Sequence, residues 1–507
     1  MINPFQQWFN VSNAGLRALS QIGITTHWLI LQYSIGLFTV TVGFEILARW
    51  LKKQVYLDIA KSLSKVSIVI FAAGAATGSA GEFGLLLFWP GFLELAGKYF
   101  FIPFYMELFA FFAEVIFVYM YYYTWDRAGP RFHLFMGLMG VFGLYASALL
   151  IMTANTLMGF PPGIQATYDP TTGLISEPTF ALTMPDGTQA VLTSSDIHQV
   201  IATDPDRFQA ILGATLKQEG IFGMVFSGPG VMTSFLHATI SAILVTIFTI
   251  IGVYSYRYIH QPETSKEYYR EGIRILSFFA IVNFVLQGII GHFVAHDVAR
   301  YNPEKLAAIE GTSANFTGIS DLPLLGPWVD PFITFLAFGS FDDYLPNYDN
   351  INGDYQAPII IHYIYYAKMF LIVGLVLNIS IFSLFYIRRR TNPPDWFIKV
   401  NYSSPVFINL ITLFGWMVRE IGRKPWTIYG MIPVEDAART EPVPPILIAG
   451  VFIYCFVLLG GVIFIVYYLF RIPSEKEFSD RVETPAVEPQ EKADNLVVVE
   501  GGSDDGI

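Results

Sequence analysis

A small set of ionisable and thioether side chains lies inside otherwise apolar stretches of this 507-residue sequence, and these residues could do chemistry. They are His27, Glu82, Glu107, Glu114, His237, His292, His362, Lys368, Met369 and Glu420. Imidazole and thioether groups are the usual axial ligands of haem iron, and carboxyl groups transfer protons. The residue types therefore indicate a redox cofactor combined with proton transfer.

Two of the acids, Glu107 and Glu114, are seven residues apart, which places them on one face of a helix at two depths. Such a pair could relay protons. Two buried acids that are satisfied by hydrogen bonds to neighbouring helices would have the same spacing. The spacing alone leaves both interpretations open.

The other candidates also have a second interpretation. A lone histidine such as His27 or His237 on an apolar helix is often a hydrogen-bonded packing residue, and Met369 could fill a lipid-facing or core position. Arg423 and Lys424 lie in the segment REIGRKPW. They either anchor the chain at the membrane edge within an aromatic belt or bind the carboxylates of a haem.

The elements that must position these residues are membrane-spanning helices. Hydrophobic residues make up 53% of the chain, charged residues only 14%, and the mean hydropathy is +0.49. Soluble proteins carry about 25% charged residues. We predict an all-α polytopic membrane protein with about nine transmembrane helices. Their expected ranges are 26–48, 66–89, 101–123, 133–158, 230–255, 275–294, 357–387, 404–421 and 444–470.

The composition also excludes several classes of protein. The single cysteine, Cys455, rules out an internal disulfide framework, a four-thiolate iron–sulfur cluster and a CxxCH haem attachment site. A net charge of −11 argues against nucleic acid as a partner. With the loops set aside, the buried histidines reduce to His27, His237 and His362, with His292 and His296 at the outer edge.

Lysine and arginine gather in the loops after the first, third, fifth, seventh and ninth predicted helices, whereas residues 160–225 and 297–356 contain few of them. Basic residues favour cytoplasmic loops. We therefore predict the N-terminus outside and the C-terminus in the cytoplasm. In that topology nearly all candidate residues lie in the outer half of the membrane.

The predicted organisation has seven parts. They are an interfacial N-terminal segment (1–25), helices one to four (26–159), an outside loop with a β-hairpin around residues 179–193 (160–229), helices five and six (230–294), a second outside loop (295–356), helices seven to nine (357–471) and a disordered cytoplasmic tail (472–507).

In this order, the candidate residues resemble subunit I of cytochrome bd-type quinol oxidases over about residues 17–471. Seven features carry the resemblance: Arg17 with His27, GAATGSAGEF (74–83), MELFAFFAE (106–114) followed by WDR (125–127), SALLIMTAN (147–155), FLHATISA (235–242), NPEKLAAIEG (302–311) and WMVREIGRKPW (416–426). Each segment alone is weak, but seven in order on helices of this topology are highly specific.

The resemblance implies a set of haem ligands. His27 would be the axial ligand of one of two haems at the oxygen site and Glu420 that of the other, and which of the two haems binds oxygen stays open. His237 would be one ligand of a low-spin haem b. Met369 would be the second ligand, with His362 as the reserve.

Further residues acquire roles in the same way. Arg423 and Trp416 would contact haem. Two haems b are expected, with haem d or a further haem b at the oxygen site.

The resemblance also assigns the reaction's acids and bases. Lys305 and Glu310 would be the quinol-oxidising pair in the loop 295–356, which makes that loop the quinol-binding loop. Glu107 and Glu114 would serve proton delivery to the oxygen site and charge compensation of haem.

The implied function is the haem-bearing catalytic subunit of a terminal quinol:oxygen oxidoreductase in the cell (cytoplasmic) membrane. It would oxidise quinol at the outer face and reduce O2 to water with cytoplasmic protons, which generates proton motive force without pumping. The expected partners are a homologous large subunit II, small single-span subunits, membrane quinone and O2. The alternative is a haem-bearing paralogue that acts as an electron-transfer or partner subunit without O2 reduction. A transporter or channel without a cofactor is a third reading.

Overall fold

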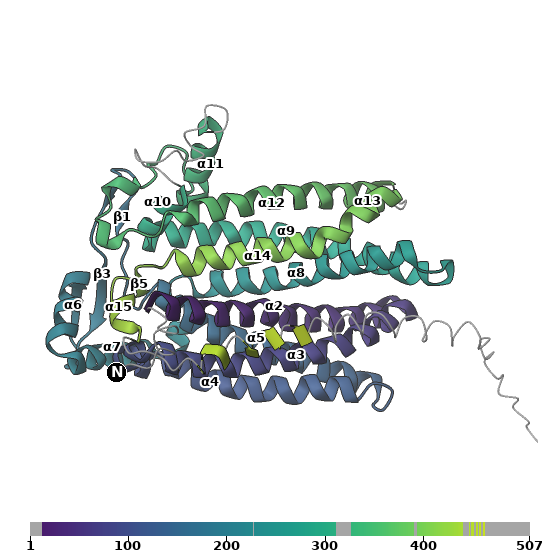
Figure 1. Cartoon of the computed structure of the whole chain (residues 1–507), viewed down its shortest axis with the longest axis horizontal. Coiled ribbons are helices and arrows are strands. Elements are labelled where there is room, and N and C mark those ends of the chain that lie inside the picture. Colours follow the sequence, from purple (N-terminus) through teal and green to yellow (C-terminus); the bar gives the residue numbers. More distant parts are fainter. Residues whose placement is uncertain are drawn as a thin grey trace, which may run out of the picture.

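The computed structural model describes residues 13–226, 228–310, 326–389 and 393–439, with a few short pieces between 446 and 461. Long helices lie side by side in one bundle. Short strands and helices cover one of its ends, at the left of Figure 1. The observed class is the all-helical one that the composition predicts.

Long helices make up the described part of the bundle. They are α2 (Asn13–Leu51), α3 (Gln54–Phe88), α4 (Pro90–Tyr123), α5 (Pro130–Gly159), α8 (Val231–His260), α9 (Glu263–Tyr301), α12 (Ile360–Phe382) and α14 (Ser404–Ile421). Proline occupies the first turn of α4, α5 and α14, where its missing N–H costs no helical hydrogen bond. Because α2 begins at Asn13, the described part of the N-terminal segment runs directly into the first predicted helix.

Eight helical stretches of the described chain are long and apolar enough to cross a membrane. They overlap the first eight predicted ranges, so the protein is an integral membrane protein of the all-α class. The ninth range, 444–470, lies largely outside the described residues, and so do Cys455 and the tail 472–507.

Glycine permits close contact between helices, for example at Gly143 and Gly36. A Cβ atom on Gly143 of α5 would lie 2.9 Å from the Cα of Glu114 in α4, and one on Gly36 of α2 would lie 2.2 Å from the carbonyl oxygen of Ala242 in α8. Real Cβ atoms do not approach so closely. Larger side chains at these positions would push apart helices that carry candidate residues.

Residues 160–226 and 424–439 form a cap over one end of the bundle. The cap contains β1 (Tyr168–Asp169), β2 (Leu174–Ile175), β3 (Thr179–Thr183), β4 (Gln189–Thr193), α6 (Ser194–Thr203), α7 (Pro205–Phe226), β5 (Trp426–Ile428), β6 (Ile432–Pro433) and α15 (Val434–Ala437). Strands β3 and β4 pair antiparallel with Thr179 opposite Thr193, at the residues where the sequence predicts a hairpin. A capping box at Thr193 and Asp196 then starts α6.

The cap packs onto the bundle through one shared apolar core. Phe88 of α3 and Leu157 of α5 belong to the same buried cluster as Phe180 of β3 and Phe208 of α7. Trp426 belongs to this cluster as well and is 4% exposed, so it packs inside the cap and is not part of an aromatic belt. Burial of this apolar surface fixes the cap on the helix ends.

The described parts of the segment 295–356 lie at the capped end too, with α10 (Pro303–Glu310), α11 (Gly326–Phe338), η2 (Tyr348–Asn350) and η3 (Gly353–Tyr355) (Figure 1). At the opposite end, α12 continues into the π-helical η4 (Ser383–Arg389), and α13 (Asp395–Val400) and η5 (Asn401–Ser403) lead into α14.

One inference from the sequence is wrong. His133, at the start of α5, is buried with 3% exposure, although it is missing from the predicted set of buried histidines. Its Nδ1 lies 3.0 Å from Glu45 Oε1 and its Nε2 lies 3.0 Å from the Tyr121 carbonyl oxygen. Hydropathy placed His133 at a helix end and could not show that α2 and α4 supply partners there.

Candidate active site at the capped end of the bundle

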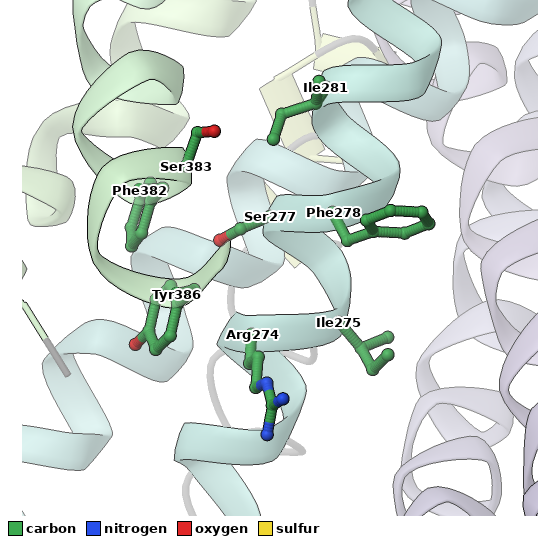
Figure 2. A pocket seen from close by; sticks show the side chains of 8 residues that line it. All are labelled: Arg274, Ile275, Ser277, Phe278, Ile281, Phe382, Ser383 and Tyr386. Carbon is green, nitrogen blue, oxygen red and sulfur yellow. The ribbon is translucent and has the colours of Figure 1, made fainter. Parts of the chain in front are cut away.

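Two different regions could hold a functional site. A cavity of about 390 Å³ lies between α9 and the end of α12, with Arg274, Ser277, Phe382 and Tyr386 in its wall (Figure 2). None of its lining residues is a candidate from the sequence. The candidate residues gather elsewhere, where the helices meet the cap.

His27 projects from α2 towards α3. Its Nδ1 is 2.9 Å from the hydroxyl of Thr77, and the ring lies against Gly78, where a Cβ atom would come within 3.2 Å of Cε1. Thr77 therefore orients the imidazole through one nitrogen, and the glycine makes room for the ring. A second group that fixes a histidine in this way is the usual companion of a metal-ligating imidazole.

Trp28 and Trp416 connect α2 with α14. Their rings stack with centroids 4.7 Å apart and an interplanar angle of 13°. This contact brings the residue after His27 next to the helix that carries Glu420.

Glu420 ends α14 and is 4% exposed. Its carboxylate accepts hydrogen bonds from Arg423 at 2.7 Å and from the Asn155 amide at 3.3 Å. Arg419 donates to the other side of Asn155 at 2.6 Å and to Thr156 at 3.0 Å. A buried carboxylate with these partners is held in one orientation by two helices.

The sequence missed Arg419 and Asn155 as functional residues. Both lie within the recognised segments SALLIMTAN and WMVREIGRKPW, but no periodicity or spacing relates two residues 264 positions apart. Only the packing of α5 against α14 brings them together.

His237 projects from α8 towards α9. Its Nδ1 and Nε2 lie 3.2 Å and 3.1 Å from the amide nitrogen of Gln287, and a Cβ atom on Gly291 would lie 3.6 Å from the ring. The charges of Lys368 and Arg419 reach this histidine. His237 is thus partly buried and feels the positive charge of cations from α12 and α14.

Two residues of α12, Met369 and His362, are the predicted alternatives for the second haem ligand. His362 is 2% exposed, and its Nδ1 lies 2.8 Å from the carbonyl oxygen of Ile309, so its ring is engaged with α10. Met369 is half-buried, while Phe370 beside it is 78% exposed. The described neighbours of the His237 ring are Gln287 and Gly291 of α9, and Met369 as the second ligand stays a prediction.

Lys305 and Glu310 occupy α10, and each contacts a different spanning helix. The Lys305 ammonium donates to the carbonyl oxygen of Arg419 at 3.4 Å, at the end of α14. Glu310 is 2% exposed and accepts a hydrogen bond of 2.9 Å from the Tyr366 hydroxyl of α12. The structure therefore places both residues against the helices that carry Glu420 and Met369.

Burial changes the acidity of both groups. Burial, helped by repulsion from Arg419 and Arg423, lowers the pKa of Lys305 to about 7. Burial also raises the pKa of Glu310 to about 8, against the opposing hydrogen bond from Tyr366. Both groups can change protonation state near neutral pH, as catalytic acids and bases must.

Positive charge exceeds negative charge where α10 meets α12 and α14. The charged groups that act on Lys305 are Arg419, Arg423, Lys368 and the carboxylate of Glu420. That group contains three cations and one anion, and Lys305 adds a fourth positive charge when it is protonated. Buried charges are normally paired, so an excess of cations favours the binding of an anionic group there.

Glu107 and Glu114 lie on α4 and face α5. Ser147 donates a hydrogen bond to Glu107 at 2.7 Å, and Glu114 is 6% exposed and packs against Gly143. The charge of Glu107 acts on Glu114. The two acids thus face the same neighbouring helix, as their spacing predicts.

These contacts define a class of protein: a polytopic helical membrane protein with buried or partly buried histidines, acids and cations at one end. A profile described as cytochrome bd terminal oxidase subunit I matches residues 16–476. The chain belongs to this family, and its general role is that of a terminal oxidase subunit.

Two relatives come from Bacillus subtilis (strain 168). The putative cytochrome bd menaquinol oxidase subunit I is 25% identical over 465 residues, which cover 88% of this chain and 93% of the relative. The cytochrome bd ubiquinol oxidase subunit 1 is 22% identical over 489 residues, which cover 90% of this chain and 93% of the relative.

The fold is also similar to a solved structure, the bd oxidase from Geobacillus thermodenitrificans. The TM-score is 0.71 at 20% sequence identity, and the match covers 92% of this chain and all of the other. The two proteins share the arrangement of helices.

Proposed function

We propose that this chain is the haem-bearing catalytic subunit of a quinol:oxygen oxidoreductase in the cell membrane. One observation carries the proposal: Lys305 of α10 contacts the end of α14, the helix that carries Glu420. A site for quinol oxidation on α10 would therefore adjoin the proposed oxygen site. Family membership and the relatives' names support the same reaction.

The residues fit haem by their donor chemistry. Thr77 engages Nδ1 of His27, which leaves Nε2 as the coordinating nitrogen. Among the described residues, the buried indole N–H groups of Trp28 and Trp416 and the Nε of Arg423 have no hydrogen-bond partner. Unpartnered donors beside an excess of cations suit the propionate groups of haem.

In this proposal His27 and Glu420 hold the two haems of the oxygen site, and His237 holds a low-spin haem b with Met369 as its second ligand. Two haems b and a haem d or further haem b are expected. When bound, these groups supply one-electron transfer and an iron that binds oxygen.

The chain's own residues act on quinol at α10, which we call the quinol helix. Glu310 is the base that accepts a proton from a quinol hydroxyl, and Tyr366 orients its carboxylate. The Lys305 ammonium stabilises the negative charge that develops on the quinol oxygen. Oxidation releases two electrons and two protons per quinol, and the protons leave at the outer face.

Glu107 and Glu114 deliver protons to the oxygen site from the cytoplasmic side. Their positions on one face of α4, opposite α5, support transfer from one carboxyl group to the other. Protons from quinol are released outside, and the protons for oxygen reduction are taken up from the cytoplasm. The reaction therefore separates charge across the membrane without a pump. Subunit II and small single-span subunits are the proposed partners.

Purified complex tests the proposal directly. We expect quinol-dependent oxygen uptake that Glu310→Gln abolishes while the haem spectrum remains. A complex with haem but no oxygen uptake would instead favour the alternative, an electron-transfer or partner subunit. Tyr363→Phe, an exposed tyrosine of α12, is a suitable control for changes near the site.

A further inference from the structure

The contact between Glu304 and Tyr429 lies beside the quinol residues and has no part in the proposed chemistry. The Tyr429 hydroxyl donates a 2.5 Å hydrogen bond to Glu304 Oε2. Tyr429 is 1% exposed and Glu304 is 3% exposed. A carboxyl group with so little solvent depends on such a partner. The contact therefore joins the quinol helix to the turn between β5 and β6.

That turn has a fixed place on the cap. The Tyr429 N–H donates to the carbonyl oxygen of Met158 at 2.9 Å, and the Ser194 hydroxyl donates to the Gly430 carbonyl oxygen. Gly430 has a φ of +67°, and a Cβ atom there would lie 2.8 Å from the Phe180 ring. Only glycine adopts this backbone at so short a distance without strain. The tyrosine is thus held by α5, β3 and α6.

The other polar contacts described for the quinol helix lead to spanning helices. Lys305 contacts α14, while Ile309 and Glu310 contact His362 and Tyr366 of α12. Glu304 differs because its partner belongs to the cap. Without this contact the helix would keep its attachments to α12 and α14 but lose the one that fixes its first turn against the cap.

We propose that Glu304 and Tyr429 are a positioning pair, through which the cap sets where Lys305 and Glu310 meet the incoming quinol. This inference rests on the proposed function. The pair would give residues 160–226 of the cap a function, which is to hold the quinol helix in position. Neither member of the pair needs to touch quinol.

The test uses the full complex and the variant Tyr429→Phe, which removes only the donor. We expect the KM for a short-chain naphthoquinol or benzoquinol to rise about tenfold, the factor that corresponds to the loss of one buried hydrogen bond. The kcat at saturating quinol should stay within about twofold, because the groups that react are still present. The affinity for the quinone analogue heptyl-hydroxyquinoline N-oxide should fall by the same factor as the KM rises.

Conservative and matched variants separate this role from general stability. Glu304→Gln keeps an acceptor oxygen for Tyr429, so its KM should stay within about threefold of wild type. Tyr168→Phe removes another buried hydroxyl of the cap, whose partner is the Tyr344 carbonyl oxygen at 2.6 Å, and should leave the KM unchanged. The haem spectra of all three variants should match wild type.

A wild-type KM and analogue affinity in Tyr429→Phe would overturn the proposal, and so would an equal rise in KM for Tyr168→Phe. If Tyr429→Phe does not assemble, Glu304→Ala carries the same test with the same expected rise in KM. A wild-type complex that oxidises no quinol would overturn the proposed function together with this pair. An active wild type with an unaffected Tyr429→Phe overturns the pair alone.

Discussion

Two buried polar regions lie at opposite ends of the bundle, and they differ in how their charges are balanced. At one end Glu45 is fully buried and is paired with Arg49 and His133, and His133 also contacts the Tyr121 carbonyl oxygen. At the capped end, three cations, Arg419, Arg423 and Lys368, and the single carboxylate of Glu420 act on Lys305.

This difference in charge balance indicates which buried charges have a function beyond stability. The Glu45 cluster is closed, because each charged group already has an opposite partner from the chain, and such a network stabilises one packing of the helices. The cluster at the capped end is open, because among the described residues that act on Lys305 the cations outnumber the single carboxylate. We therefore propose a structural role for the first region and cofactor and substrate binding for the second.

The largest predicted effect comes from replacing histidines in each of the two polar regions. His27→Ala and His237→Ala should each remove a haem signal and abolish quinol-dependent oxygen uptake, since each removes a proposed haem ligand. His133→Ala should keep the spectrum and lower the free energy of unfolding by about 3 kcal/mol, because it deprives buried Glu45 of one partner. Difference spectra and thermal unfolding of the purified complexes measure both effects. Loss of haem in His133→Ala would contradict the assignment.

The next effect concerns proton delivery. Glu107→Gln or Glu114→Gln should slow oxygen reduction about 100-fold, since an amide cannot pass on a proton. The KM for quinol should not change, because the quinol-binding residues lie on α10 and not on α4. Oxygen uptake at varied quinol concentration measures both constants. Unchanged turnover in both variants would show that the α4 acids are structural.

The pH profile tests the base on the quinol helix. Glu310 is protonated below its pKa of about 8 and accepts a proton only above it, so kcat/KM for quinol should rise as pH increases through about 8. The hydrogen bond from Tyr366 favours the carboxylate, and Tyr366→Phe should therefore move the rise to higher pH. A profile that is the same in Tyr366→Phe and wild type would exclude Glu310 as the base.

The smallest effect compares two arginines. Arg49→Gln should cost about 1 kcal/mol of unfolding free energy and leave activity intact, because Arg49 is partly exposed in a closed cluster. Arg419→Gln removes a cation beside Glu420 and should shift the absorption spectrum and the midpoint potential of the complex. Equal spectral effects of the two substitutions would remove the distinction between the clusters.

The sequence predicts the class of fold well, because spanning helices need long apolar runs that hydropathy detects directly. The hairpin at residues 179–193 can also be predicted from the sequence, since alternating strand residues flank a Pro-Asp-Gly turn. The contacts of Glu45 with His133 and of Arg419 with Asn155 join distant segments, and no local pattern encodes them. The resemblance named most of the site, whereas the partners that orient it came only from packing.

Absorption spectroscopy of the purified complex tests the central claim most directly. The account predicts a Soret band in the reduced-minus-oxidised spectrum and a CO-induced shift, with the CO-reactive component lost in His27→Ala or Glu420→Ala but kept in His133→Ala. A folded complex without a Soret band, or one whose CO shift survives both substitutions at the capped end, would contradict it.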